Sequence, residues 1–309
     1  MNADATIALT GATGFVGQAV LDEAEARGLT LRALTRRPQP ARNGVAWVAG
    51  SMSDAASLTE LVRGADAVLH VAAMTTAPDA VAFTACNVTG TATLIEAAKA
   101  TAIKRFVFVS SLSAREPALS LYGASKAEAE KLVAASGLDW TVVRPPGVYG
   151  PRDVDYFEMF RSARKLGLVP LPPRGASSIL HVHDLARLLL DLIAAPAALV
   201  RHKLFEPDDG REGGWSHAEL AQAIGRAVGR RRVFAPHLPA GLLRAAAHVD
   251  GLMRGSKSRL TPDRVGYMTH PNWVSRSAFA VPGDVWEPRI GGAEGLARTA
   301  SWYEARGWL

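Results

Sequence analysis

The chain has 309 residues, of which 48% are hydrophobic and 21% are charged, and its formal net charge is +6. These proportions are typical of ordered globular proteins and exclude a disordered or fibrous chain. The single cysteine, Cys86, excludes an internal disulfide and a metal site built from several cysteines. The positive charge leaves three classes of partner open: an anionic cofactor, a nucleic acid and an anionic membrane surface.

No segment of the sequence predicts secretion or membrane insertion. The first ten residues lack a basic region followed by an apolar block, so we expect no secretory signal. The longest apolar stretch, residues 184–200, is interrupted by Arg187, Asp191 and Pro196, so we expect no transmembrane helix. These features predict a cytoplasmic protein.

Short apolar runs alternate with amphipathic stretches over the first 145 residues. Strands are expected at TIALT (6–10), TLRALTR (30–36), AVLHVAA (67–73), RFVFVSS (105–111) and WTVVRPP (140–146), and helices from residue 15 and at 54–62, 80–100 and 122–135. Such alternation implies crossover connections and a parallel sheet that is covered on both faces. The expected fold class is α/β, with a doubly wound parallel sheet of the Rossmann type.

The alternation ends after Pro151, where Pro and Gly cluster at residues 168–175 and 207–214 and helices are expected at 216–229 and 239–253. One more strand and helix, at residues 178–193, are expected to return to the first domain. The predicted domains are therefore residues 1–150 plus 177–200 for dinucleotide binding and residues 151–176 plus 201–309 for substrate binding. We expect the smaller, discontinuous second domain at the carboxyl edge of the sheet, where open α/β folds bind ligands.

The stretch TGATGFVG, residues 10–17, places Gly11, Gly14 and Gly17 between a strand and a helix. Glycines there allow a tight turn, and the amide groups at the positive end of the helix suit a pyrophosphate. The second strand ends in Arg36 and Arg37, with no acid to bind the ribose 2′-hydroxyl of NAD. A guanidinium pairs well with a 2′-phosphate, so NADP(H) is favoured over NAD(H), although either arginine is also explained as a solvated surface charge.

Tyr122 and Lys126 are four residues apart on an expected helix, so both side chains project from one face. A nearby ammonium lowers the pKa of a tyrosine and makes it a usable proton donor for carbonyl and alcohol chemistry. The strand upstream ends in Ser110, Ser111 and Ser113. We expect Ser111 to bind the substrate oxygen, Ser113 to be the second choice, and Ser110 to satisfy backbone groups at the strand end.

Seven motifs resemble the extended short-chain dehydrogenase/reductase family, in its NAD-dependent epimerase/dehydratase branch with dihydroflavonol-reductase-like and 3β-hydroxysteroid-dehydrogenase-like reductases. In the order of the chain they are TGATGFVG (10–17), LHVAA (69–73), NVTGTATLIEAA (87–98), VSS (109–111), YGASKAEAE (122–130), RPPGVYGP (144–151) and HVHDLA (181–186). They cover about the first two thirds of the chain.

The resemblance implies a role for each matching position. Catalysis would rest on Ser111, Tyr122 and Lys126, with Tyr122 and Lys126 also contacting the cofactor. The cofactor would be held by Gly11, Gly14 and Gly17, the amides of Phe15 and Val16, Ala72 and Ala73 beside the adenine ribose, and Pro145 and Val148 behind the nicotinamide ring. Asn87 matches a family asparagine, with strand bracing and direct catalysis both open as its role. The family's G-D-x-x-D reads GSMSD here, so adenine recognition would rest on the Ser51 hydroxyl and the Met52 backbone.

Several other residues have simpler explanations. His181, His183 and Asp184 are expected to anchor the sheet, and no metal is expected because no further ligands occur at suitable spacing. Arg144 and Arg152 are expected as solvated charges or as contacts for an anionic substrate. Residues 238–260 combine an apolar stripe with Arg244, Arg254, Lys257 and Arg259, which suits either a lid over the substrate or peripheral contact with the inner face of a membrane.

The expected activity is NADPH-dependent transfer of hydride to or from a carbonyl or secondary alcohol of a hydrophobic substrate, whether steroid-, flavonoid- or lipid-like. One alternative is a nucleotide-sugar epimerase or dehydratase, and another is a non-catalytic NAD(P)-binding sensor or assembly subunit. The expected partner is a small hydrophobic molecule, and a homodimer is compatible with the sequence. Nucleic-acid binding is not expected, because the basic residues are scattered and form no known reading module.

Overall fold

The computed structural model describes residues 5–103, 105–255 and 260–309, which form two compact units. The first unit comprises Met1–Pro145, His183–Pro207 and Phe279–Glu287, and the second comprises Pro146–Val182, Asp208–Ala278 and Pro288–Leu309. These units differ from the predicted domains in a few segments, since 201–207 and 279–287 lie in the first unit and 146–150 and 177–182 in the second. The assignment of cofactor binding to one domain and substrate binding to the other stays a prediction.

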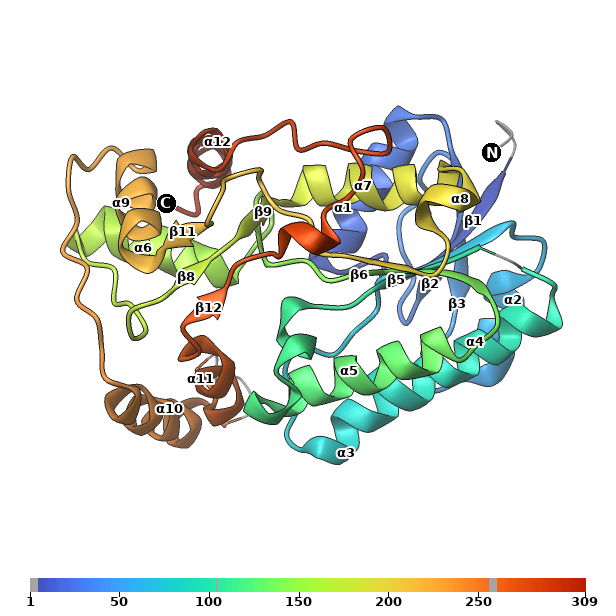
Figure 1. Cartoon of the computed structure of the whole chain (residues 1–309), viewed down its shortest axis with the longest axis horizontal. Coiled ribbons are helices and arrows are strands. Elements are labelled where there is room, and N and C mark those ends of the chain that lie inside the picture. Colours follow the sequence, from blue (N-terminus) through green and yellow to red (C-terminus); the bar gives the residue numbers. More distant parts are fainter. Residues whose placement is uncertain (1–4, 104, 256–259) are drawn as a thin grey trace. The chain divides into compact units, whose positions relative to one another are not determined.

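A seven-stranded parallel sheet forms the centre of the first unit (Figure 1). Its order is β3-β2-β1-β4-β5-β6-β10, and the chain order reverses between β1 and β4. This arrangement confirms the predicted doubly wound α/β fold. The strands are β1 (Thr6–Thr10), β2 (Thr30–Thr35), β3 (Val45–Ala49), β4 (Ala67–His70), β5 (Arg105–Val109), β6 (Asp139–Val143) and β10 (Lys203–Phe205).

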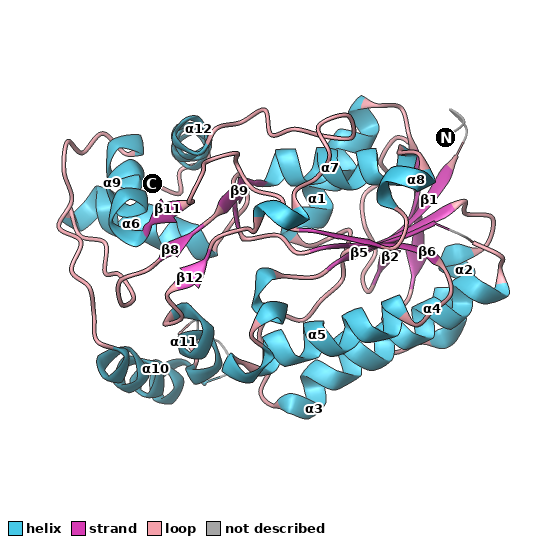
Figure 2. Ribbon diagram, viewed as in Figure 1, coloured by secondary structure: helices cyan, strands magenta, loops and turns pink. Residues whose placement is uncertain are grey.

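Helices cover both faces of this sheet, with α2, α4 and α5 along one face and α1 and α7 along the other (Figure 2). Apolar residues such as Val68, Leu94, Phe106 and Phe108 are buried in the layer between the sheet and the first of these groups. The helices of the unit are α1 (Phe15–Ala26), α2 (Ala55–Val62), α3 (Ala80–Phe83), the π-helix η1 (Thr84–Thr89), α4 (Gly90–Ala100), the 3-10 helices η2 (Leu112–Arg115) and η3 (Pro117–Leu119), α5 (Leu121–Ala134), α7 (Val182–Ala194) and α8 (Ala197–Val200).

The second unit has its own core, which includes Tyr149, Phe160, Ile224, Leu296 and Tyr303. Its two small sheets pair β7 with β9 and arrange three strands as β11-β8-β12. Its elements are β7 (Gly147–Tyr149), α6 (Asp155–Leu166), β8 (Ala176–Ser177), β9 (Ile179–His181), β11 (Trp215–Ser216), α9 (His217–Ala227), α10 (Ala240–Arg254), α11 (Pro262–Met268), β12 (Asn272–Trp273) and α12 (Gly292–Ala305), and η5 (Ser277–Phe279) leads back to the first unit. Among the described residues, no helix combines the length and apolar character needed to cross a bilayer.

Candidate active site

The turn after β1 accepts only residues without a side chain at two positions. Gly11 has a φ of +75°, and a Cβ there would lie 2.6 Å from the backbone nitrogen of Ala72. A Cβ on Gly17 would overlap the carbonyl oxygen of Gly11. Gly14, the N-cap of α1, donates its amide hydrogen to that same oxygen over 3.0 Å. The turn is thus packed closely against the segment after β4, at the point where the strand order reverses.

The N-terminus of α1 fits an anionic group. Within the described chain no side chain caps this helix, and its first turn holds no acidic residue. The amides of Phe15 and Val16 lie in this turn, ahead of the first helical hydrogen bond from Gln18 N–H to Gly14 O at 2.9 Å. Amide donors and the positive end of the helix dipole therefore face the glycine turn, an arrangement that suits a pyrophosphate.

Other predicted cofactor residues follow the ends of neighbouring strands. Arg36 and Arg37 come directly after β2 and are exposed, and neither guanidinium forms an ion pair within the described ranges. Ala72 and Ala73 come after β4 and are half-buried. The carboxyl ends of adjacent parallel strands share one edge of a sheet, so these segments lie at the same edge as the glycine turn.

Ser51 and Met52 follow β3 on the outer side of this edge. The Ser51 hydroxyl bonds the Ser53 hydroxyl at 2.9 Å. Met52 packs on α4 at Gly90, where an added Cβ would lie 3.0 Å from the Met52 side chain. Adenine recognition by these two residues stays a prediction.

A buried hydrogen-bonded chain beneath the site was not foreseen from the sequence. The Ala72 amide donates to Thr10 Oγ1 (3.1 Å), Thr10 Oγ1 bonds His70 Nδ1 (2.7 Å), and His70 Nε2 bonds Thr91 Oγ1 (2.9 Å). Because the Thr91 hydroxyl donates to the Asn87 carbonyl (2.7 Å), His70 must donate from Nε2 and accept at Nδ1. Burial lowers the His70 pKa to about 3, which keeps the ring neutral.

Residues 110–113, which follow β5 and are called the serine segment, are held in a defined conformation by hydrogen bonds. Ser111 Oγ accepts hydrogen bonds from Ser113 N (3.2 Å) and Ser113 Oγ (2.9 Å). These bonds use the acceptor capacity of the Ser111 hydroxyl, so its own hydrogen remains to be donated. The Leu112 amide donates to the Pro145 carbonyl (3.0 Å), which places Pro145 beside this segment. Val148 lies on β7 in the second unit, paired with Leu180.

The first turn of α5 packs against the same serine segment. Ser120 caps the helix by accepting from the Gly123 amide at 2.9 Å. A Cβ on Gly123 would lie 2.6 Å from the Ser113 carbonyl oxygen, so glycine is required for this contact. Tyr122 is half-buried, with its ring centroid 6.3 Å from that of Phe83. The structure thus brings the segment of Ser111 and the turn carrying Tyr122 together.

Lys126 is 1% exposed, although it carries an ionisable amine. Its Nζ donates to the Val109 carbonyl at 2.7 Å and lies 4.1 Å from the centroid of the Phe108 ring. Burial lowers the pKa of Lys126 to about 7, against the opposing influence of Glu130 and Cys86. A lysine tuned in this way by burial is typical of functional sites.

Asn87 lies in the π-helix η1, a rare element that often marks functional sites. Its Nδ2 donates to the Met74 carbonyl (2.9 Å) and to Ser125 Oγ (2.9 Å), and its Oδ1 accepts from the Met74 amide (2.8 Å). The side chain thereby ties the segment after β4 to α5. Of the two roles left open by the sequence, this geometry supports bracing.

Two expectations about neighbouring residues are corrected. Ser110 Oγ donates to the Glu130 carboxylate rather than to backbone groups. Arg144, expected to be solvated or to meet substrate, is 14% exposed and makes a bidentate pair with Glu130 at 2.8 and 2.6 Å. No role for Glu130 was predicted from the sequence, although Glu130 lies one helical turn after Lys126 and a carboxylate there faces the same side of α5.

Two residues of the HVHDLA motif, His181 and Asp184, contact neighbouring side chains. His181 packs edge-on against Tyr149, with centroids 5.4 Å apart, and Asp184 pairs with Arg187 at 2.9 Å. Within residues 5–103, 105–255 and 260–309, no group of three or more His, Cys, Asp or Glu residues is arranged to hold a metal ion.

Comparison with known proteins agrees with this geometry. A family model described as NAD(P)H-binding matches residues 11–196. The ceramide reductase of Caulobacter vibrioides is 32% identical over 318 aligned residues, which cover 100% of this chain and 97% of that protein. A ketoreductase of Stigmatella aurantiaca, which is named for a farnesyl-dihydroquinoline oxide, is 33% identical over 172 residues, 48% of this chain and 52% of that protein.

Solved structures share the fold at lower identity. The UDP-glucose 4-epimerase of Thermus thermophilus in complex with NAD superposes with a TM-score of 0.70 and 21% identity, covering 98% of this chain and 100% of that one. The family model, the full-length relative and the glycine turn at the switch point of the sheet all agree. The chain belongs to the extended short-chain dehydrogenase/reductase family, in the epimerase/dehydratase branch, and is an NAD(P)-dependent oxidoreductase.

Proposed function

We propose that the protein is an NADPH-dependent reductase that converts a ketone of a ceramide-class or similar long-chain lipid into a secondary alcohol. The observation that carries the proposal is the match to the ceramide reductase, which extends over 100% of this chain. The match therefore includes residues 197–309, which the cofactor-family model does not cover. Because relatives in a superfold differ mainly in their substrate-binding parts, likeness over the second unit supports a shared substrate class.

The residues around the glycine turn fit a dinucleotide with a 2′-phosphate. Gly11, Gly14 and Gly17 leave room for a pyrophosphate, and the first turn of α1 supplies amide donors. Arg36 is the residue proposed to pair with the 2′-phosphate, assisted by Arg37, since both are exposed at the end of β2. NADPH, when bound, supplies the hydride for the reduction.

The chain's own residues would manage the proton and the substrate oxygen. Tyr122 would give its phenolic proton to the carbonyl oxygen as the ketone is reduced. Ser111 would donate its hydroxyl hydrogen to the same oxygen, because Ser113 already occupies its acceptor sites. Lys126 in its ammonium form would lower the pKa of Tyr122 and hold the cofactor ribose.

The test measures NADPH consumption at 340 nm against a panel of long-chain keto-amides, small ketones and nucleotide sugars. We expect turnover of the long-chain ketones, preference for NADPH over NADH, and loss of that preference in Arg36→Asp. Tyr122→Phe should lower kcat by about a thousandfold, because a general acid contributes roughly 10²–10⁴ to the rate. Interconversion of sugars without net oxidation of NADPH would instead establish the epimerase, and nucleotide binding without any turnover would establish a sensor.

A further inference from the structure

Four charged side chains form a chain of ion pairs where β5, β6 and β10 end. Arg144 pairs with Glu130 of α5 at 2.6 Å and with Glu206 at 3.6 Å, and Glu206 also pairs with Arg115 of η2 at 3.4 Å. Exposure of the side chains ranges from 0% for Glu206 to 14% for Arg144. A buried charge without a partner is costly, so each member depends on the others.

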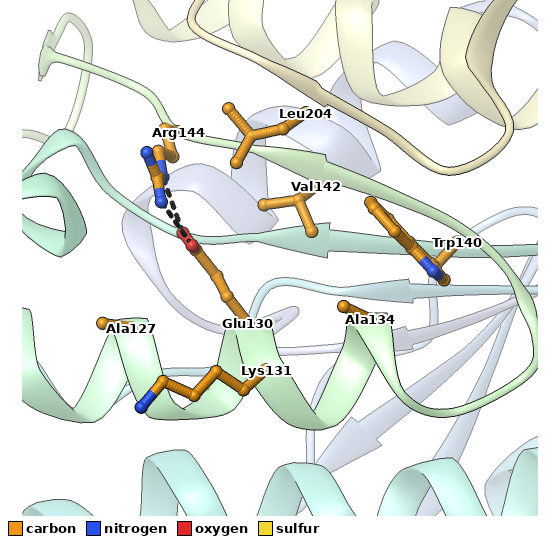
Figure 3. Close-up of a pocket in the computed structure, with 8 residues that line it drawn as sticks. All are labelled: Ala127, Glu130, Lys131, Ala134, Trp140, Val142, Arg144 and Leu204. Atoms are coloured by element: carbon orange, nitrogen blue, oxygen red, sulfur yellow. Dashed lines mark hydrogen bonds and ion pairs between the residues drawn. The ribbon is translucent and has the colours of Figure 1, made fainter.

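Glu130 and Arg144 line a groove of about 330 Å³ between α5 and β6. Figure 3 shows their side chains facing each other. The rest of the groove is mainly apolar and is lined by Ala127, Ala134, Val142, Leu204 and Trp140, with Lys131 at its edge. The pair is therefore largely shielded from water, with Arg144 14% and Glu130 11% exposed. A carboxylate with few waters around it acts strongly on charges close to it.

Two side chains of α5, one turn apart, bind two successive residues at the end of β5. Lys126 Nζ donates to the Val109 carbonyl at 2.7 Å, and the Glu130 carboxylate accepts from the hydroxyl of Ser110. Ser111 is the next residue, and η2, which follows it, is bound at its far end through Arg115 and Glu206. The short serine segment is therefore fixed from both sides by the same ion-pair network.

Glu130 also acts on the protonation of Lys126. The groups that face the Lys126 amine are the Phe108 ring and Val109 carbonyl of β5, His70 of β4, Cys86 of η1 and Glu130 of α5. His70 is neutral, and two of these groups favour the ammonium form, with the Glu130 carboxylate as the larger influence and Cys86 as the smaller one. Burial opposes that form, and the balance between the two effects places the pKa of Lys126 at about 7.

We propose that Glu130 is a positioning residue: bound to Arg144, it fixes Ser110 and thereby the serine segment against α5, and it keeps the Lys126 amine charged beside Tyr122. This proposal rests on the roles assigned above to Ser111, Tyr122 and Lys126. It predicts that a neutral side chain at position 130 changes both the rate and its dependence on pH.

The first experiment needs no substrate. The chain has seven lysines, so enzyme labelled with ¹³C at lysine Cε can be titrated by NMR, with the Lys126 signal assigned by its loss in Lys126→Arg. In Glu130→Gln, the Lys126 midpoint should move to lower pH by about one unit, because the favouring charge is gone. Glu128→Gln is the matched control, since Glu128 lies on the same helix, is 51% exposed and pairs with Lys131. An unchanged Lys126 midpoint in Glu130→Gln would overturn the electrostatic part of the proposal.

The second experiment follows kcat against pH with the ketone that the enzyme reduces. The ammonium is the active form, so activity is lost as the pH rises through the Lys126 pKa. Glu130→Gln should move this alkaline limb to lower pH and reduce kcat at the optimum about tenfold, with KM and the NADPH Kd changed less than about twofold. Glu130→Asp keeps the charge on a shorter side chain and should restore the position of the limb with only part of the rate.

Arg144→Lys separates the fixing of the serine segment from the electrostatic effect of Glu130 on Lys126. The substitution keeps both charges of the pair but loses its bidentate geometry. It should lower kcat without moving the alkaline limb to lower pH. A Glu130→Gln enzyme with a lower rate but an unshifted limb would reduce Glu130 to a purely structural residue and overturn the proposal. Absence of ketone turnover in the wild-type enzyme would defeat the proposed function, whereas the NMR titration would still decide the link between Glu130 and Lys126.

Discussion

The hydrogen bonds of the buried His70 determine which of its ring nitrogens carries the proton. Both ring nitrogens are bonded, one to Thr10 and one to Thr91, and the direction of each bond follows from the donors available. The ring also packs against Phe108, and the Phe108 ring in turn lies 4.1 Å from the Lys126 amine. A protonated ring would repel that amine, so neutrality of His70 protects the ammonium of Lys126.

The ionisation of His70 should contribute to the pH dependence of the free energy of unfolding. Unfolded His70 takes up a proton below pH 6.5, whereas burial lowers its folded pKa to about 3, so its contribution to stability is complete above pH 6.5 and is lost as the pH falls toward 3. In His70→Gln the ionisable group is absent. Between pH 6.5 and 5, the wild-type free energy of unfolding should fall by about 2 kcal/mol more than that of the variant, measured by urea unfolding. Identical pH profiles would contradict a neutral, buried His70.

The glycine turn and the Tyr122–Lys126 pair could be predicted from the sequence, because each depends on the spacing of residues within one short segment. The partners of Arg144 were not visible. Glu130, Arg144 and Glu206 come from three elements that the sheet brings together, and nothing local to any of them reports the others. The same holds for His70, whose partners lie on β1 and α4.

At the scale of elements, periodicity identified long helices and buried strands well and failed on short or irregular ones. The helix expected at 80–100 proved to be three consecutive pieces, α3, the π-helix η1 and α4. A π-helical turn widens the backbone by one residue without altering the pattern of apolar positions enough to be recognised. The edge strand β10 has three residues, too few to show alternation, and so its segment was assigned to the second domain.

The helix α10 has an exposed apolar face. Leu242, Val249 and Met253, at spacings of seven and four, share one exposed face with Leu252, and their exposures run from 54% to 88%. Lys257 and Arg259, part of the same predicted segment, lie outside the described residues. An exposed apolar stripe on a helix with arginines beside it suits the surface of an anionic bilayer.

We expect the protein to sediment with vesicles of phosphatidylglycerol and phosphatidylcholine. The double variant Leu252→Gln and Met253→Gln should remain in the supernatant yet reduce detergent-dispersed ketone at the wild-type rate. Leu166→Gln is the control, because Leu166 is 72% exposed at the end of another helix. If the double variant instead raises KM in detergent and the wild type ignores vesicles, α10 serves as a lid over the substrate.

On the scale of the whole molecule, the class of fold followed from the sequence because a doubly wound sheet repeats one pattern many times. Strand and helix alternate for 145 residues, and every repeat adds to the inference. The second unit offers no such repetition. Its sheets have strands of two or three residues, and its core joins segments as far apart as Tyr149 and Tyr303.

Cofactor binding should be measurable as an increase in the Tm of the protein. A ligand at one hundred times its Kd stabilises the folded state by about 2.7 kcal/mol, so NADPH should raise Tm by several degrees and NADH by less at equal concentration. Gly17→Ala should abolish the shift, because the added Cβ overlaps the Gly11 carbonyl. Gly251→Ala, also within a helix but with open space around its Cβ position, should keep it. An equal shift in Gly17→Ala would place the nucleotide elsewhere.

The amide donors in the first turn of α1, which no described side chain caps, bear on the lifetime of the protein in the cell. Many helices have a side-chain cap at the N-terminus, whereas no described side chain caps α1, so its first amides would be bonded by the nucleotide only while it is bound. Proteases act on the transiently opened chain, so the rate of degradation would follow the nucleotide pool. A smaller total pool of NADP(H) would then shorten the half-life of the enzyme as well as slow its turnover.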